Sequence, residues 1–579
     1  MPPMNLSGSI IKSLFVGNIL EENLFPFPEL DKDSAETIRM VVDSVEKFMG
    51  SKTKELKEFD EEGYQSENYL NELKELGLFG LIIPEEYGGL GLNSTGYARV
   101  VQQTTKHDGS TALTIGAHTS IGLKGLLLFG TDEQKQRYLP KLATGEWLAA
   151  FCLTEPGSGS DAASIKTSAT KNPDGTWTLS GEKIWITNGP LAQFFTVFAK
   201  TESAEGKLTG FIVEKGFDGV SSGPKEDKLG IRASATSSIF FNNVVVPANN
   251  VLGEVGSGFK VAMAILNSGR TGLGGGCVGA MKKCIALSVE HAKNRKQFGK
   301  SISEYGLVQD KIVQMTQRCF AAESMVAVIG NLIDSNVEDY SLEAAATKIY
   351  CSEALWYVVN ESLQIAGGNG YMKEYPYERI LRDSRINMIF EGTNEILRLY
   401  IGLAGLKDVG SYLQEVKKSG SEIFNDPIKG FGTLSKYVTK KVASMTSLGR
   451  DKIEGVHPSL SEEAAVIEKY TTRLNSASET TLMSVGKRII DDQFRTKRLA
   501  DASIELFAAL CVLSRVNSIV EKVGIEKSAD ERQLTRIYVK QAKRRINGSI
   551  RRLISNEDRE VKSLAASVIQ SGGYRWDTL

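Results

Sequence analysis

The segment FCLTEPGSGSDAAS, residues 151–164, stands where the pattern of the chain changes from helical to strand-like. Before it, apolar residues recur at helical spacing in 34–49 and 68–76, and Thr131 opens a further helical pattern. After it, β-branched and aromatic residues alternate with polar ones in TWTLSGEKIWI (176–186), FFTVFAK (194–200), GFIVEK (210–215) and SSIFFNNVVVP (237–247). The sequence therefore predicts a helical domain over 1–150 and a small β domain over 151–258.

Helical periodicity returns near Phe259 and continues in 284–295, 307–329, 342–366 and 394–406. This pattern predicts a second helical domain over 259–406. Residues 407–455 are richer in Gly, Ser and Lys and are predicted to form a connector. Beyond it, an apolar stripe that includes Leu506, Leu510 and Leu513 predicts an extra C-terminal helical domain over 456–579. The fold class is mainly α with a central β domain.

The composition is ordinary for a globular protein and excludes several functions. Of 579 residues, 41% are apolar and 24% charged, and 69 basic residues balance 70 acidic ones, so nothing indicates nucleic-acid binding. Six cysteines without a CxxC pair and four scattered histidines predict no metal site. No apolar run reaches the roughly 20 residues of a membrane-spanning helix. The protein is predicted to be soluble or peripheral.

The segment RINMIFEGTNEILR, residues 385–398, places Glu391 between an apolar run and a helix start. A partly desolvated carboxylate has a raised pKa, which suits a general base, and Gly392 lets a ligand approach closely. The alternative is a carboxylate stabilised at a helix N-terminus by the helix dipole. This segment alone favours the alternative. Companion motifs elsewhere in the chain reverse that preference.

Six motifs carry a resemblance to a known family. They are LKELGLFGLIIPEEYGGLGL (73–92), LLLFGTDEQKQRYLPKLATGE (126–146), FCLTEPGSGSDAAS (151–164), GEVGSGFKVAMAILNSGR (253–270), QIAGGNGYMKEYPYERILRD (364–383) and IFEGTNEILRLYI (389–401). In this order they resemble the acyl-CoA dehydrogenase family, most closely its very-long-chain type, which shares the extra C-terminal domain. The resemblance implies an N-terminal helical domain, a β-barrel-like middle domain and a catalytic four-helix bundle.

The resemblance also implies FAD as cofactor. A side chain cannot accept the hydride that leaves C3 of an acyl thioester, so a redox cofactor is required. The residues implied to contact the flavin and its pyrophosphate are Phe151, Leu153, Thr154, Gly159, Ser160, Trp185, Ile186, Thr187, Thr393 and Glu395. A neighbouring subunit is implied to contact the adenosine pyrophosphate, which requires a homodimer, through Arg295, Gln297, Phe298, Gln364, Gly367 and Gly368. Glu395 departs from the Gln or Asp often found in the family, which leaves its contact open.

Substrate contacts follow from the same resemblance. It assigns Glu391 to removal of the C2 proton and assigns acyl-CoA contacts to Ser160, Asn267, Arg270, Phe390, Gly392 and Gly116. Small residues at 114–117 imply a deep acyl cavity. Gly274, Gly275 and Gly276 replace a usual alanine, either widening the space beside the ligand or allowing close helix packing.

The predicted function is 2,3-dehydrogenation of long- and very-long-chain acyl-CoA in fatty acid β-oxidation, with electron-transferring flavoprotein as acceptor. The alternatives are a respiratory complex I assembly factor of the same family and an acyl-CoA oxidase. The basic segment 433–452 is interpreted as an interfacial helix for anionic lipid or as a solvated loop. The N-terminus does not resemble a transit peptide. The predicted location is the matrix side of the mitochondrial inner membrane, or the cytoplasm of a bacterium.

Overall fold

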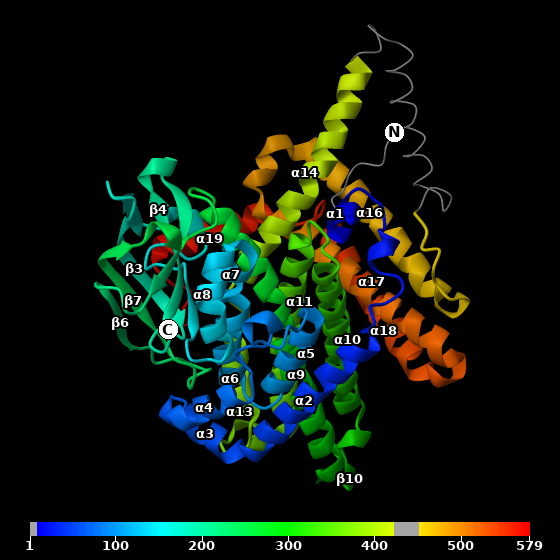
Figure 1. The fold of residues 1–579 in the computed structure, drawn as a ribbon. Coiled ribbons are helices and arrows are strands. Elements are labelled where there is room, and N and C mark those ends of the chain that lie inside the picture. The colour runs from blue at the N-terminus through cyan, green and yellow to red at the C-terminus, as the bar shows by residue number, and fades with distance from the viewer. Residues whose placement is uncertain (1–7, 422–450, 579) are drawn as a thin grey trace. The chain divides into compact units, whose positions relative to one another are not determined.

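The computed structural model describes residues 8–421 and 451–578 (Figure 1). The chain divides into two compact units. One comprises residues 28–396. The other joins the residues up to Phe27 with those from Leu397 onward. The structure confirms the predicted fold class, mainly α with a central sheet.

The first part of the 28–396 unit is helical, and most of its helices begin at a side-chain cap. Asp31, Ser66, Asn93 and Asp108 each accept a hydrogen bond from a backbone N–H in the first turn. Thr131 and Gln134 form a reciprocal capping box. The helices predicted over 34–49 and 68–76 are confirmed. This part contains α2 (Lys32–Ser51), α3 (Thr53–Glu62), α4 (Glu67–Glu75), α5 (Ser94–Thr105), α6 (Gly109–Gly116), a π-helical turn (Ala117–Gly122), α7 (Lys124–Phe129) and α8 (Asp132–Ala143).

The middle part is an eight-stranded sheet, as the alternating pattern predicted. The strand order is β6-β7-β3-β2-β4-β5-β8, and β1 pairs in parallel with β4. Most other pairs are antiparallel, and β2 also pairs in parallel with β4. The strands are β1 (Ala149–Cys152), β2 (Ser168–Lys171), β3 (Trp177–Thr187), β4 (Phe194–Thr201), β5 (Lys207–Glu214), β6 (Val220–Lys225), β7 (Thr236–Val246) and β8 (Val251–Leu252).

Three long helices, α9, α10 and α11, pack side by side after the sheet (Figure 1). Consecutive glycines of α9 face α5, and a β-carbon on Gly275 would lie 2.6 Å from the carbonyl oxygen of Ala98. Gly274 instead faces Val326 and Thr347. The glycine stripe therefore serves close helix packing. The elements are α9 (Gly258–Asn294), β9 (Lys296–Gln297), β10 (Lys300–Ser301), α10 (Gly306–Asp334), α11 (Ser341–Ala366), α12 (Gly368–Tyr371), α13 (Tyr377–Ser384) and a 3₁₀ turn (Arg385–Met388).

The other unit is helical where it is described. Its elements are α1 (Ile10–Phe15), α14 (Asn394–Ser421), whose first turn belongs to the 28–396 unit, α16 (Ser461–Val485), α17 (Gln493–Lys527), α18 (Ala529–Arg551) and α19 (Asp558–Ser571). Leu506, Leu510 and Leu513 are buried in α17, as predicted. The connector predicted from residue 407 is wrong over 407–421, because α14 continues through these residues. The predicted interfacial helix at 433–452 lies outside the described residues, except for Asp451 and Lys452.

Within residues 8–421 and 451–578, two helical stretches, 109–129 and Gln493–Lys527, are long and apolar enough to cross a membrane. Within α17, 78% of the most apolar window is buried inside the protein. Burial in a core accounts for that composition, since a core helix needs the same apolar residues as a membrane span.

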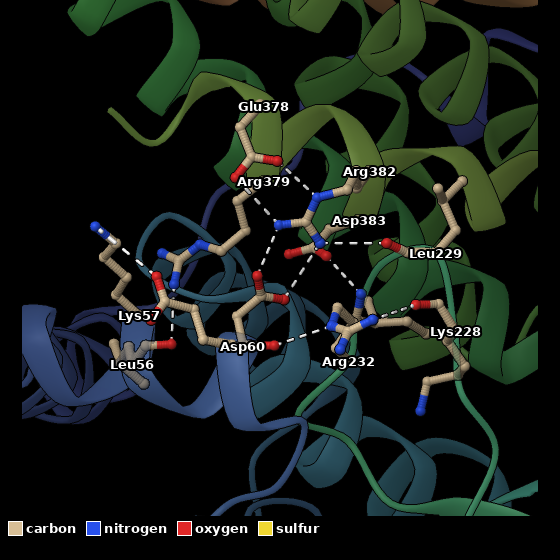
Figure 2. A network of polar contacts seen from close by, with 12 residues as sticks. Leu56, Lys57, Asp60, Lys228, Leu229, Arg232, Glu378, Arg379, Arg382 and Asp383 are labelled. Carbon is tan, nitrogen blue, oxygen red and sulfur yellow. Dashed lines mark hydrogen bonds and ion pairs between the residues drawn. The ribbon is translucent and has the colours of Figure 1, made fainter. Parts of the chain in front are cut away.

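A polar network holds α13 against α3 and the loop 228–232 (Figure 2). Arg382 Nη2 donates to Asp60 Oδ2 at 2.6 Å, and Nη1 donates to the carbonyl of Leu229 at 3.2 Å. Asp383 accepts from the backbone N–H of Ile231, which has a positive φ of 48°. Burial, with the charge of Asp108, raises the pKa of Asp383 to about 7. The network joins three regions of the chain. One of them, α13, directly precedes the segment that carries Glu391.

We expect Arg382→Met to lower the free energy of unfolding by about 3 kcal/mol, because it leaves buried carboxylates without their counter-charge. Urea denaturation of the purified protein measures this. The control is Arg137→Met, since Arg137 pairs with Glu214 on a side chain that is 46% exposed, and should cost less than about 1 kcal/mol. Equal effects of the two substitutions would contradict the role given to the network.

Candidate active site

Glu391 lies in a left-handed turn between the 3₁₀ turn 385–388 and α14. Its φ is 56°, and that of Gly392 is 92°. A positive φ is uncommon for a residue with a β-carbon, and such strain gathers at functional sites. The next residue, Thr393, accepts a hydrogen bond from the N–H of Ile396 at 3.3 Å and so caps α14. The side-chain cap of α14 is therefore Thr393, not Glu391.

The carboxylate of Glu391 is desolvated. Its Oε2 is buried and has no hydrogen-bond partner among the described residues. Burial raises the pKa of Glu391 to about 7, although the positive charges of Arg270 and Lys348 oppose the shift. A carboxylate with that pKa is ionised over a useful range near neutral pH and still binds a proton readily.

Two cations hold the backbone of this turn. Arg270 Nη2 donates to the carbonyl oxygen of Glu391 at 3.2 Å, and Lys348 Nζ donates to that of Gly392 at 2.8 Å. Arg270 Nη1 also donates to Asn267 Oδ1 at 2.6 Å. The structure thus brings the predicted site residues Asn267, Arg270, Glu391 and Gly392 together, and Phe390 precedes them in the chain.

The space in front of the carboxylate is kept open by a glycine. A β-carbon on Gly269 would lie 3.6 Å from both carboxylate oxygens and 2.9 Å from Ile121 Cγ2. Ile121 and Phe151 both pack against the hydrophobic cluster that contains Leu153. Glu391 and the segment predicted to contact the flavin therefore both lie near Ile121.

The predicted acyl-cavity segment reaches the same region through Tyr97. Its hydroxyl accepts from Thr119 Oγ1 at 2.8 Å, and a β-carbon on Gly116 would meet only this hydroxyl, at 3.7 Å. Burial, together with the charge of Glu391, raises the pKa of Tyr97 to about 12. Asn188 Nδ2 donates to the carbonyl of Thr114 at 2.9 Å, which ties the end of β3 to α6.

The segment 151–160 is fixed by hydrogen bonds and an ion pair from β3, and the space next to its glycines is open. Lys183 Nζ lies 2.7 Å from Glu155 Oε1 and donates to the carbonyl of Leu153 at 3.1 Å, and Ile184 N–H donates to that of Thr154 at 2.9 Å. A β-carbon on Gly157 or Gly159 would meet nothing within 4 Å. Small residues over a fixed backbone suit close approach by a phosphate.

The second predicted flavin segment lies at the end of β3. Trp185 has a φ of 57°, and its side chain is 64% exposed, so the backbone turns to present the indole. Ile186 is buried in the core of the sheet and could contact a ligand only through its backbone. Thr187 is half-buried, Ser160 and Glu395 are exposed.

The remaining predicted cofactor residues lie at neighbouring helix ends away from Glu391. The hydroxyl groups of Ser288 on α9 and Ser362 on α11 are 2.9 Å apart, so the two helices are in contact there. Ser288 precedes Arg295–Phe298 in the chain, and Ser362 precedes Gln364–Gly368. Helical rise separates Arg270 from Arg295 by roughly 35 Å. Phe298 is 95% exposed, and Gly367 and Gly368 leave open space. Figure 1 shows β10 at the far end of α9 and α10 from the sheet. One chain does not bring these residues to its own Glu391.

The sequence reasoning missed Lys348, Tyr97 and the Glu155–Lys183 pair. Lys348 interrupts the otherwise apolar face of a predicted helix, and Lys183 does the same within a predicted strand. A lone lysine on a buried face indicates a fixed partner, because an unpaired buried charge is costly. That signal was present in the sequence, but the identity of each partner was not.

Comparisons with known proteins agree with this geometry. Sequence profiles match for the N-terminal domain (35–146), the middle domain (150–244) and the C-terminal domain (256–406) of acyl-CoA dehydrogenase, and for the ACAD9/ACADV C-terminal domain (458–574).

One curated relative is the very long-chain specific acyl-CoA dehydrogenase, mitochondrial, of Homo sapiens, which is 43% identical over 98% of this chain and 88% of its own length. A solved acyl-CoA dehydrogenase complexed with FAD from Bacillus anthracis is 33% identical, covers 96% of this chain and 94% of its own, and has a TM-score of 0.81. Butyryl-CoA dehydrogenase from Megasphaera elsdenii is 37% identical and covers 66% of this chain and 100% of its own, with a TM-score of 0.63. The chain therefore belongs to the acyl-CoA dehydrogenase family.

Proposed function

We propose that this chain catalyses FAD-dependent 2,3-dehydrogenation of long- and very-long-chain acyl-CoA to trans-2-enoyl-CoA, the first step of fatty acid β-oxidation. The observation that carries the proposal is the desolvated carboxylate of Glu391, whose Oε2 has no partner among the described residues. In this proposal Glu391 removes the proton from C2 of the acyl thioester.

Polarising the thioester carbonyl makes the C2 proton acidic enough for a carboxylate to remove. The N–H of Glu391 has no backbone acceptor in the described part of the chain, whereas Ile389 and Phe390 donate to Ile386 just before it. A donor fixed by the left-handed turn suits the thioester oxygen, because it is already oriented when charge develops. Arg270 and Lys348 hold that turn from the carbonyl side.

The residues present fit FAD. The pyrophosphate matches the open Gly157 and Gly159, and the exposed indole of Trp185 offers a cover for the flavin ring, next to the half-buried Thr187. FAD bound there supplies the hydride acceptor for C3. Thr393 and Glu395 adjoin the base and complete the proposed cofactor contacts.

A homodimer completes the proposed cofactor site. Arg295, Gln297 and Phe298, with Gln364, Gly367 and Gly368, lie far from Glu391 in the same chain and are exposed, which supports their contact with the adenosine pyrophosphate of a partner's FAD. Arginine is suited to that role, since it stays charged and forms paired hydrogen bonds to phosphate.

Chain length is set by the space beyond the reacting carbons. Gly116 leaves open space next to the hydroxyl of Tyr97, which supports the proposal that the site accepts a long acyl chain. Each buried methylene adds about 0.8 kcal/mol, so neighbouring lengths are weakly distinguished.

The proposed electron acceptor is electron-transferring flavoprotein. A mitochondrial location is proposed from the names of the mammalian relatives.

We expect anaerobic addition of acyl-CoA to bleach the flavin absorbance, with the largest rate for long chains in a series from butanoyl- to tetracosanoyl-CoA. Glu391→Gln should slow bleaching by about 10²–10⁴-fold, because the amide cannot take the proton. Glu374→Gln, an exposed carboxylate upstream in the chain, is the control and should bleach normally. Substantial bleaching by Glu391→Gln would remove this residue from the mechanism. Absence of bleaching in the unmodified protein would favour the assembly-factor role, and rapid oxygen consumption would favour an oxidase.

Glu391→Gln should also stabilise the protein at alkaline pH. The folded pKa of about 7 exceeds the ordinary value of 4.5, so folding favours the protonated carboxyl, and stability is lost as pH rises through 7. Glutamine does not titrate. The gain in the variant should be small at pH 4.5 and reach up to about 3 kcal/mol at pH 8. Thermal denaturation of the two FAD-loaded proteins across this range tests the sign. A gain that is the same at every pH would contradict the assigned pKa.

A further inference from the structure

Lys348 is a buried lysine on α11 that the proposed mechanism does not yet explain. The residue is fully buried, and its Nζ donates to two neutral oxygens, the carbonyl of Gly392 at 2.8 Å and Asn394 Oδ1 at 2.9 Å. Asn394 is fixed in turn, because its Nδ2 donates to Ser352 Oγ at 3.0 Å and to Glu353 Oε1 at 3.1 Å. The ammonium group is therefore held in one place, directly behind the turn that carries Glu391.

A helix interior does not require a lysine at this position. Burying an ammonium group without a carboxylate in direct contact is unfavourable, and an apolar residue would pack at lower cost. Burial lowers the pKa of Lys348 to about 8, which shows that its surroundings disfavour the charge. A destabilising charge that faces a strained turn is better explained by what it does to that turn than by packing.

The turn accepts hydrogen bonds at two successive carbonyl groups, those of Glu391 and Gly392. Arg270 holds the carbonyl of Glu391 from α9, and Lys348 holds that of Gly392 from α11. Both residues of the turn have positive φ, so each carbonyl must be fixed to keep the carboxylate aimed at the space beside Gly269. Lys348 thus reaches the carboxylate through the backbone and through its charge.

The charged and titratable groups that surround Lys348 and Glu391 come from several elements. They are Arg270 and Cys277 on α9, Tyr97 on α5, and Glu353 on α11. Arg270 and Lys348 are the cations whose charge lowers the pKa of Glu391 against the effect of burial. Cys277 and Tyr97 are neutral at physiological pH because burial raises the pKa of each to about 12.

We propose that Lys348 is a positioning residue for proton removal: it holds the Gly392 carbonyl and keeps a fixed positive charge beside Glu391 without hydrogen bonding to its Oε2. The inference rests on the proposed role of Glu391 as base. The two functions of Lys348 are separable. A neutral hydrogen-bond donor at position 348 can still donate to the carbonyl of Gly392 but no longer carries the charge.

The test measures the pH dependence of anaerobic flavin bleaching, as the rate divided by the concentration of a long-chain acyl-CoA below saturation. In Lys348→Gln, the acid limb of this profile should move to higher pH by about 0.5–1 unit, because losing a nearby cation makes the carboxylate harder to ionise. Lys348→Met also loses the hydrogen bond to the carbonyl of Gly392. It should show the same shift and a further fall in the pH-independent rate of about tenfold.

Lys228→Gln is the matched control. Lys228 is half-buried, donates to the carbonyl of Ser234 and to Thr236 Oγ1, and has a pKa lowered by burial to about 8. The charges that act on it are those of Lys225, Glu226, Arg232 and Asp383, not that of Glu391. Its substitution should leave the acid limb in place.

An unshifted acid limb in FAD-loaded Lys348→Gln that still bleaches would overturn the inference and leave the proposed function intact. Bleaching that survives in Glu391→Gln would overturn the proposed function instead. If Lys348→Gln yields no FAD-loaded protein, Lys348→Arg carries the test: a retained acid limb with a lower rate supports the inference, and a limb shifted to higher pH overturns it.

Discussion

The left-handed turn at Glu391 and Gly392 is the constraint on which the rest of the site depends. A general base must be desolvated to have a pKa near neutrality, yet a desolvated carboxylate is unfavourable in a folded protein. This chain meets both demands by fixing the backbone on either side. Arg270 and Lys348 hold successive carbonyl groups, and Thr393 starts α14 immediately afterwards. The carboxylate is thus held through its backbone, while its Oε2 has no hydrogen-bond partner among the described residues.

Features that depend on local sequence could be predicted well. The helix start at Thr131, the strand over Trp177–Thr187 and the buried face of α17 follow from caps, alternation and helical periodicity within a few residues. Glu391 and Arg270 were predicted to belong to one site because a resemblance connected two motifs far apart in the chain, and the structure places them in contact. Residues 407–421 were misjudged since glycine and lysine content outweighed the helical pattern, although packing or length can carry a helix through such residues.

Features that depend on tertiary contacts could not be predicted. Nothing near Lys348 in the sequence points to the carbonyl of Gly392, which lies 44 residues away. The pairing of Arg382 with Asp60 spans 322 residues, and that of Lys183 with Glu155 crosses from a strand to a loop. For Lys348 and Lys183, the sequence showed only that a charge interrupts an apolar face. Only the fold shows which atom receives it.

The network around Arg382 joins segments that are synthesised at different times. Its members come from α3, from the loop 228–232 and from α13, and the segment carrying Glu391 follows α13 directly (Figure 2). During synthesis, α3 and the sheet emerge from the ribosome well before residue 382, so they can fold first and present Asp60 and Ile231 as a finished surface. The segment that carries Glu391 follows the last of these three regions to be synthesised. Its carboxylate can therefore take its place only after all three regions of the network have been made.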